Sequence, residues 1–316
     1  MQFVIKRVLA AIPVVFLTSV IIFSLMRLLP GDPITVMAGQ SQSDASPELL
    51  QQLRHQYGFD RPVYVQYGLW VQRALSGDLG YSVYNRLPVW DVLRPRILPT
   101  AQIGLTAWIL AILVSLPLGA YTAVRMNSWV DWLGTALALI GAAMPYFLTG
   151  GLFIYFVAMR GGMLPASGFV SPFVDFWQSV RTTILPALTL TFALIAVLTR
   201  QARSSFAETM QLAYIRTARA KGLGEGAVVF RHAAQNAILP VVTILGLQLG
   251  SLFSGAVVTE TVFAVPGVGR LLVDAILSRD YAVVQAVVLF ITLSVVLANL
   301  LVDIAYGLLD PRIKQS

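Results

Sequence analysis

Cysteine is absent from this chain of 316 residues, and histidine is scarce. The absence of cysteine excludes disulfide bridges, thiolate nucleophiles and cysteine-ligated metal sites. The two histidines, His55 and His232, lie far apart, which excludes the HExxH pattern of zinc peptidases. The sequence also lacks a GxxxxGK[ST] nucleotide-phosphate loop and a GxSxG nucleophile elbow. If the protein performs energised transport, the energy source must therefore lie on another chain.

Charged residues are also scarce in this chain. Only 12% of the residues are charged, against about 25% in soluble proteins, while 57% are hydrophobic and the mean hydropathy is +0.75. This balance is typical of an all-α protein that crosses a membrane several times. The net charge of +7 could suggest nucleic-acid binding, but in a membrane protein it more often reflects basic cytoplasmic loops.

Long apolar runs divide the chain. Six of them approach the roughly 20 residues that a helix needs to cross a bilayer, and they predict a bundle of six transmembrane helices. The runs are 8–29, 100–124, 132–157, 182–199, 237–262 and 283–301. The first follows Lys6 and Arg7 and has no cleavage site after it, so we interpret it as an uncleaved helix.

The predicted organisation has four parts. Residues 1–30 form the first transmembrane helix and 31–98 an external cap. Residues 99–309 form a core of five transmembrane helices with a cytoplasmic segment at 200–236, and 310–316 form a cytoplasmic tail.

Loop charges predict that both termini are cytoplasmic. With that orientation, the cytoplasmic segments carry eleven basic residues and the two short outer loops carry four, as the positive-inside rule requires. The eleven are Lys6, Arg7, Arg125, Arg200, Arg203, Arg216, Arg219, Lys221, Arg231, Arg312 and Lys314.

The predicted spans contain prolines but no deep ionisable residue. Pro117 and Pro145 fall inside the second and third runs, where each is expected to kink its helix. Glu260 and Asp303 lie near span ends. Proton-coupled carriers usually place an acid or base inside the membrane, so its absence argues against a carrier of that kind.

The external loop is predicted to contain two short helices. Residues 46–48 read Ser-Pro-Glu, a helix-start signal, and Leu49, Leu50, Leu53 and Tyr57 follow at helical spacing. The stretch 61–77 gives a second, more aromatic helix. Together they predict a small helical cap that either packs on the bundle or contacts a partner.

The segment "RTARAKGLGEGAVVFRHAAQNAILP" (216–240) is basic and rich in small residues. A helix over 205–221 is expected to end at Gly222, Gly224 and Gly226, because glycine disfavours the helix interior. A second helix over 228–237 then leads into the membrane. From physical chemistry alone, anionic lipid is the favoured contact of the basic groups, and a partner protein is the alternative.

Several stretches resemble one family. The segment "YIRTARAKGLGEGAVVFRHAAQNAILPVVTILGLQLG" is similar to the coupling region of ATP-binding-cassette importer permeases, above all those of the dipeptide, oligopeptide and nickel group. Further stretches resemble the same group, in the same order along the chain: "LLPGDP" (28–33), "YGFDRPVYVQYGLWVQRALSGDLGYS" (57–82), "ILPALTL" (184–190), "ETVFAVPGVGRLLVDAILSRDYAVVQ" (260–285) and "LLDPRI" (308–313).

This resemblance implies a permease subunit of a bacterial inner-membrane importer for peptides or similar small solutes. It implies four kinds of partner: a second homologous permease subunit, two ATPase subunits, an external solute-binding protein and membrane lipid. No nucleic acid is expected as a partner. ATP and Mg²⁺ would be bound by the ATPase subunits, and this chain would bind no cofactor or metal and would not be an enzyme. Glutathione and nickel chelates are alternative substrates.

Two groups of residues carry the site prediction. The ATPase-coupling residues are Arg216, Arg219, Lys221, Gly222, Arg231, His232, Asn236 and Pro240. The outer-gate or binding-protein contacts are Glu260, Pro266, Gly267 and Gly269, for which a tight structural turn is the alternative. The general motif of the coupling region begins with an EAA triplet, whereas residues 217–220 here read Thr-Ala-Arg-Ala and lack the acid. A stand-alone secondary carrier, channel or receptor, or an intramembrane enzyme, are the competing functions.

Overall fold

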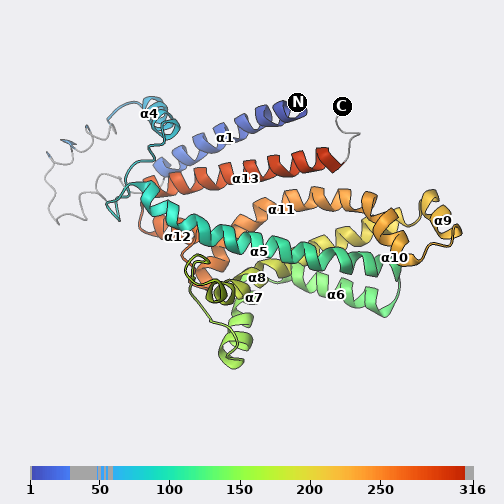
Figure 1. The fold of residues 1–316 in the computed structure, drawn as a ribbon. Helices are drawn as coiled ribbons and strands as arrows, with labels where there is room; N and C mark the ends of the chain where they lie inside the picture. Colours follow the sequence, from blue (N-terminus) through green and yellow to red (C-terminus); the bar gives the residue numbers. More distant parts are fainter. Residues whose placement is uncertain (1, 29–47, 49–50, 53–54, 56–59, 310–316) are drawn as a thin grey trace.

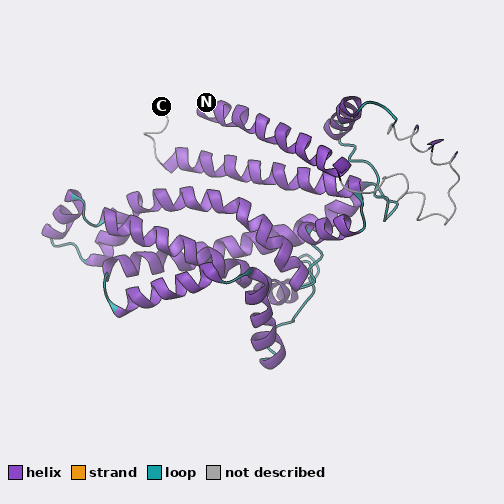
Figure 2. Ribbon diagram, turned by 180° about the vertical axis from the view of Figure 1, so that it is seen from behind, coloured by secondary structure: helices purple, strands orange, loops and turns teal. Residues whose placement is uncertain are grey.

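The computed structural model describes residues 2–28, 48, 51–52, 55 and 60–309. Within these ranges the chain is helical, with one isolated β-bridge between Tyr81 and Pro88 and no strand (Figure 2). The all-α prediction is confirmed. The predicted first cap helix, around 46–57, lies outside the described residues for the most part.

Five described helices are long and apolar enough to cross a membrane, and a bent pair can supply a sixth crossing. The five are α1 (Gln2–Leu28), α5 (Val89–Val124), α8 (Phe176–Thr209), α11 (Ala234–Val262) and α13 (Tyr281–Leu309). The bent pair consists of α6 (Trp129–Ala143) followed by α7 (Tyr146–Phe153), which continues into the π-helix η1 (Ile154–Arg160). This arrangement confirms the polytopic helical bundle.

The third crossing differs from the single run predicted over 132–157. The axis bends by 107° between α6 and the helix formed by α7 and η1, far more than a kink. Met144 is extended, with φ −79° and ψ 124°, because the residue before a proline disfavours the helical region. Pro145 also lacks an amide hydrogen, so the chain leaves α6 and restarts in a new direction. Pro117, by contrast, stays inside the continuous helix α5.

The long helices lie side by side, from α1 and α13 at one edge, through α11, to α5, α8 and α6 (Figure 1). Helix α8 lies at the centre, packed between α5, α6 and α11, and 67% of its most apolar window is buried. Helix α13 packs on α11, and α1 packs on α13 at the edge, where only 17% of its window is buried. The hydrophobic core therefore follows α8, while α1 and α13 present most of their surface outward.

Glycines allow the closest helix contacts. A Cβ at Gly119 of α5 would overlap Ala202 of α8, and a Cβ at Gly141 of α6 would lie 2.9 Å from the carbonyl oxygen of Phe192. Small residues at such positions let backbones approach, which is how membrane helices gain packing without a hydrophobic driving force. Helix α8 is thus in close contact with both neighbours.

The second predicted cap helix is present as α4 (Val63–Leu75). Tyr67 and Trp70 of α4 pack against Phe23 of α1, with ring centroids 5.4 and 5.9 Å apart. The Tyr67 and Ser19 hydroxyls form a hydrogen bond of 2.8 Å. The described part of the cap therefore packs on the first transmembrane helix.

The bundle has two distinct ends. The short helix α9 (Ala213–Ala220) lies at one end, which we call the α9 end, and α12 (Val268–Leu277) lies at the other, the α12 end (Figure 1). The start of α1 and the finish of α13 both point toward the α9 end (Figure 1), so the described chain leaves and returns on the same side.

Candidate functional site

The predicted coupling segment (216–240) belongs to a hairpin formed by α9, α10 (Glu225–Ala227), η2 (Val228–Ala233) and the start of α11, which we call the hairpin. The helix predicted before its turn is not continuous. The sequence predicted one helix over 205–221, whereas α8 ends at Thr209 and α9 begins at Ala213. The break turns α9 so that Ile215 and Ala218 are buried. Burial of this apolar face stabilises the broken arrangement, which the helical pattern alone did not predict.

The turn after α9 depends on Gly222. Its φ is +78°, a left-handed conformation that a side chain disfavours. The chain then enters α10 (Glu225–Ala227) and the π-helix η2 (Val228–Ala233), which continues directly into α11. The predicted second helix leading to Pro240 is confirmed, with a π-helical turn at its start.

Apolar and polar contacts fix the hairpin to the bundle. Val228 and Val229 of η2 are buried in the same core as Ile215. The Asn236 amide donates to the Tyr214 hydroxyl over 2.8 Å, and this hydroxyl donates to the His232 carbonyl oxygen over 3.5 Å. Helix α9 is therefore tied to α11, and the segment has a defined shape.

The predicted coupling residues lie on the outside of this hairpin. His232 is half-buried and the other seven are exposed: Arg216, Arg219, Lys221, Gly222, Arg231, Asn236 and Pro240.

The exposed side chains of the hairpin do not all have the same surroundings. Arg219 is already engaged, because its Nε and Nη2 donate to the Glu225 carboxylate over 2.7 and 3.2 Å. Within the part of the chain that the structure describes, Arg216, Lys221 and Arg231 form no ion pair.

Two apolar side chains of the hairpin were not predicted as site residues, because its bases and small residues carried the prediction. Phe230 is 70% exposed and Leu223 is 40% exposed. Phe230 also lines an open groove of about 650 Å³ between η2 and the α9 end of α5.

At the α12 end, Glu260 is fully buried near the end of α11. The Thr100 hydroxyl donates to its Oε1 over 2.5 Å, and the Arg270 amide donates to its Oε2 over 2.9 Å. The Val268 amide donates to Thr100 Oγ1 over 2.8 Å. Glu260 and Thr100 together thus satisfy amides in the first turn of α12, which otherwise lack partners. We call this set, with residues 266–270, the Glu260 turn.

The other predicted outer residues belong to the Glu260 turn. Gly267 and Gly269 are buried and Pro266 is half-buried. A Cβ at Gly267 would collide with the Glu260 carboxylate, and one at Gly269 would lie 2.6 Å from the Cα of Val257. These glycines are required for close approach, and Glu260 offers no accessible surface to a partner in this conformation.

A second buried acid at this end was not singled out from the sequence. Asp280 is 1% exposed; it accepts a hydrogen bond from the Ser82 hydroxyl over 2.5 Å and one from the Tyr84 amide over 3.3 Å. It thereby joins the end of the external loop to the connection between α12 and α13. Asp280 and Ser82 lie within stretches that carried the family resemblance, and their separation in sequence concealed the contact.

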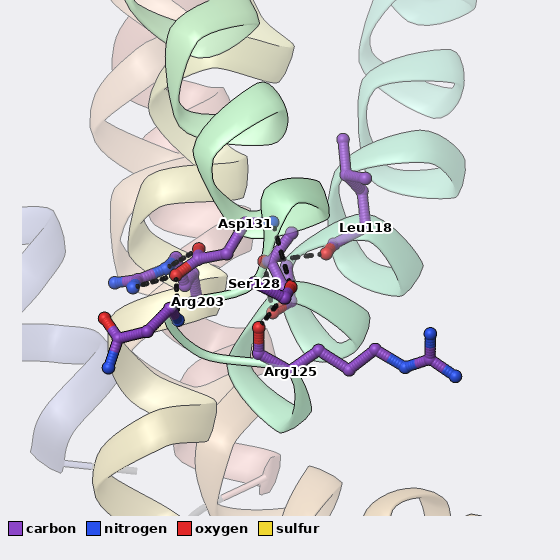
Figure 3. Close-up of polar contacts among 8 residues, drawn as sticks. Leu118, Arg125, Ser128, Asp131 and Arg203 are labelled. Carbon is purple, nitrogen blue, oxygen red and sulfur yellow. Dashed lines mark hydrogen bonds and ion pairs between the residues drawn. The ribbon is translucent and has the colours of Figure 1, made fainter.

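A third missed feature lies at the α9 end, between α6 and α8. Asp131, in the first turn of α6, is 5% exposed and points at Arg203 of α8 (Figure 3). Arg203 Nε lies 2.5 Å from Asp131 Oδ1, and its Nη2 lies 2.7 Å from Oδ2. The sequence analysis counted Arg203 only as a cytoplasmic charge. The Ser128 N-cap three residues before Asp131 was a signal for a helix start, but not for this pairing.

Among the described residues, no group of three or more His, Cys, Asp or Glu side chains is placed to hold an ion.

Comparison with known proteins gives a consistent result over the full length. A family model described as "Binding-protein-dependent transport system inner membrane component" matches residues 115–315, and a model for the N-terminal part of such components matches residues 1–104. The chain is 40% identical over 339 residues to the dipeptide transport system permease protein DppB of Escherichia coli K12, covering 100% of this chain and 99% of that protein. It is also 40% identical over 314 residues to the glutathione transport system permease protein GsiC of the same strain, covering 99% of each.

Proposed function

The chain belongs to the family of binding-protein-dependent transport system inner membrane components, as a multi-pass permease subunit of an ATP-binding-cassette importer, and we propose that it forms half of a translocation pathway for short peptides. The relatives are permease subunits and not enzymes themselves. The remaining steps concern the partners, the energy source and the substrate.

The hairpin at the α9 end is the observation that supports ATPase docking. It presents Arg216, Lys221 and Arg231, which form no ion pair among the described residues, beside the exposed side chains of Phe230 and Leu223. Interfaces commonly combine a buried aromatic anchor with a charged rim. A partner cleft with an apolar floor and acidic or carbonyl groups at its edge would accommodate both the exposed ring of Phe230 and the three bases.

The hairpin is well placed to transmit movement. Its apolar base is buried with core residues of α8 and α11. It follows α8 after a short turn and continues directly into α11. We place the α9 end in the cytoplasm because the predicted cytoplasmic loops carry most of the basic residues. ATP with Mg²⁺ would bind to the ATPase subunits, since this chain lacks a phosphate-binding loop.

Alternating access follows from differential binding. An ATPase dimer that binds one orientation of the hairpin more tightly shifts the permease toward the matching state, and hydrolysis removes that preference. The pathway would lie between this chain and a second homologous permease subunit. An external solute-binding protein would deliver the substrate at the α12 end.

Short peptides are the substrate class that the relatives favour. One relative is named for dipeptides and the other for glutathione, which is itself a small peptide, and the identity is 40% in both cases. Peptide transport is therefore the proposal, with glutathione as the second candidate. Binding measurements on the partner solute-binding protein, with dipeptides and glutathione in parallel, distinguish the two.

The test of the function is uptake by the reconstituted complex. Proteoliposomes containing both permease subunits, the ATPase subunits and the binding protein should accumulate labelled peptide only with ATP inside the compartment that corresponds to the cytoplasm. Accumulation by this chain alone, without ATPase subunits, would instead establish a stand-alone carrier or channel.

Docking is tested by reversing charge on the hairpin. Arg216→Glu with Lys221→Glu should abolish copurification of the ATPase subunits and ATP-dependent uptake. The matched control is Arg181→Glu, an exposed base near the other end of α8, which should leave both unchanged. Normal assembly and uptake in the double variant would show that these charges do not mediate docking.

A further inference from the structure

The Asp131–Arg203 pair links two helices that otherwise meet through apolar surfaces (Figure 3). Two of the three guanidinium nitrogens, Nε and Nη2, donate to the two carboxylate oxygens, a bidentate geometry that fixes orientation as well as distance. The Asn127 amide adds a third hydrogen bond to Asp131 over 3.0 Å. Asp131 is thereby anchored to the turn before α6 and to α8 at once.

Helix α6 has little other support. Trp132 and Leu139 are 72% and 55% exposed, so much of the helix faces away from the protein. Its main contact is α8, which it meets at Gly141, opposite the Phe192 carbonyl, and at Asp131 near its start. Burial of apolar surface is non-directional, whereas the ion pair fixes one orientation of the two helices. Separating the ion pair would leave an uncompensated, largely buried charge.

The position of the pair is the second observation. Arg203 lies in the last two turns of α8, which ends at Thr209 just before α9. At its other end α6 leads through the 107° bend into α7, where Gly150 lies against the ring of Phe263. Phe263 directly follows α11 and lies in the chain between Glu260 and residues 266–270 of the Glu260 turn. The pair therefore joins α8, which leads into the hairpin, to α6, which leads through the bend into α7.

We propose that Asp131 and Arg203 are a positioning pair that makes α6 move together with α8 when the hairpin is displaced, so that the movement reaches α7 and the turn at Phe263. The inference rests on the proposed function, because it requires an ATPase subunit to displace the hairpin. It adds a transmission route that is separate from the docking surface itself.

The first experiment measures whether the two helices move together. This chain has no cysteine, so Trp129→Cys on α6 and Arg200→Cys on α8, both exposed in the wild type, accept spin labels selectively in a complex with cysteine-free partners. The interspin distance should be the same in the nucleotide-free and ATP-bound complexes. With Asp131→Asn added, ATP should shift it or create a second population. The proposal is overturned if ATP changes the interspin distance as much with the pair intact as in Asp131→Asn. It is also overturned if ATP leaves the distance constant in Asp131→Asn.

The second experiment measures the number of peptides transported per ATP hydrolysed. Asp131→Asn should lower this ratio by at least about fivefold, the lower range of typical coupling between sites. Arg203→Lys, which keeps the charge but loses the bidentate contact, should give an intermediate ratio. Asp131→Arg combined with Arg203→Asp should recover part of the loss. A ratio is used because simple destabilisation lowers transport and hydrolysis together.

The matched control is Asp303→Asn. Asp303 pairs with Arg7 over 3.2 Å and joins α1 to α13, away from the proposed route. This variant should keep the wild-type ratio, and an equal loss in Asp303→Asn and Asp131→Asn would overturn the inference. A normal ratio in Asp131→Asn would also overturn it while leaving the importer function intact. A wild-type complex that shows no ATP-driven transport would instead overturn the proposed function.

Discussion

The two ends of the bundle use charged residues in opposite ways. At the α12 end, the acids Glu260 and Asp280 are buried and accept hydrogen bonds from the chain's own hydroxyl and amide groups. At the α9 end, Arg216, Lys221 and Arg231 are exposed without acidic partners of their own in the described chain. The difference teaches that the two buried acids at the first end complete the fold, whereas these three bases at the second lie accessible on the surface.

Removing the Glu260 side chain should have the largest effect. Glu260→Ala leaves the Arg270 amide without its acceptor, at about 1–3 kcal/mol for an unsatisfied group. It also leaves the Thr100 hydroxyl with only its longer contact to the Arg96 carbonyl oxygen, at 3.3 Å. We expect a large fall in the melting temperature of the purified complex. Asp274→Ala on α12 is the control, because its side chain is 58% exposed. Equal melting temperatures for the two variants would remove the contrast between buried and available charge.

Adding a methyl group at one glycine of each end should come next. Gly267→Ala drives a Cβ into the Glu260 carboxylate, and overpacking of this kind costs about 1–3 kcal/mol. Gly226→Ala meets open space and should change the free energy of unfolding by less than about 0.5 kcal/mol. Thermal melts of both variants measure this, and a fragile Gly226→Ala protein would contradict the comparison.

Truncating Phe230 should affect assembly and leave the fold intact. Because this side chain is 70% exposed, Phe230→Ala removes little packing within the chain. Loss of an interface anchor typically costs about 2 kcal/mol or more, so the affinity for the ATPase subunits should fall more than tenfold at an unchanged melting temperature. Phe173→Ala, 88% exposed in the loop before α8, is the control and should bind normally.

Breaking the Arg219–Glu225 pair should have the smallest effect. Both side chains are substantially exposed, at 41% and 55%, and surface pairs contribute about 0–1 kcal/mol. Arg219→Ala should therefore lower the melting temperature slightly at low salt, and the difference should vanish at high salt because the charges are screened. A large, salt-independent loss would show that Arg219 carries more of the hairpin than its exposure indicates.

Sequence patterns predicted the helices well where length and composition decide them. The long apolar runs became α1, α5, α8, α11 and α13, since few other structures satisfy the backbone in a bilayer. The pattern was wrong at Met144 and Pro145, where a kink was expected and a 107° bend occurs. A proline signals a disturbed helix, but neighbouring helices decide how far the axis turns.

The candidate site was predictable only in part. The hairpin was located from Gly222 and its bases, because left-handed turns favour glycine and charge is rare elsewhere in this chain. The pairing of Arg219 with Glu225 and the exposure of Phe230 were not predictable, since both depend on how α9 folds back. The coupling and gating roles assigned to these residues stay predictions.

The sequence by itself determined the class of protein, the number of apolar segments that can cross a membrane and the position of the basic hairpin, because hydropathy and charge act locally along the chain. Only the tertiary structure decided which charges meet. Asp131 finds Arg203, Glu260 finds Thr100, and Asp280 finds Ser82, although each pair is far apart in sequence. Helix packing brings these groups within hydrogen-bond distance, and where water is excluded each must find a partner within the fold.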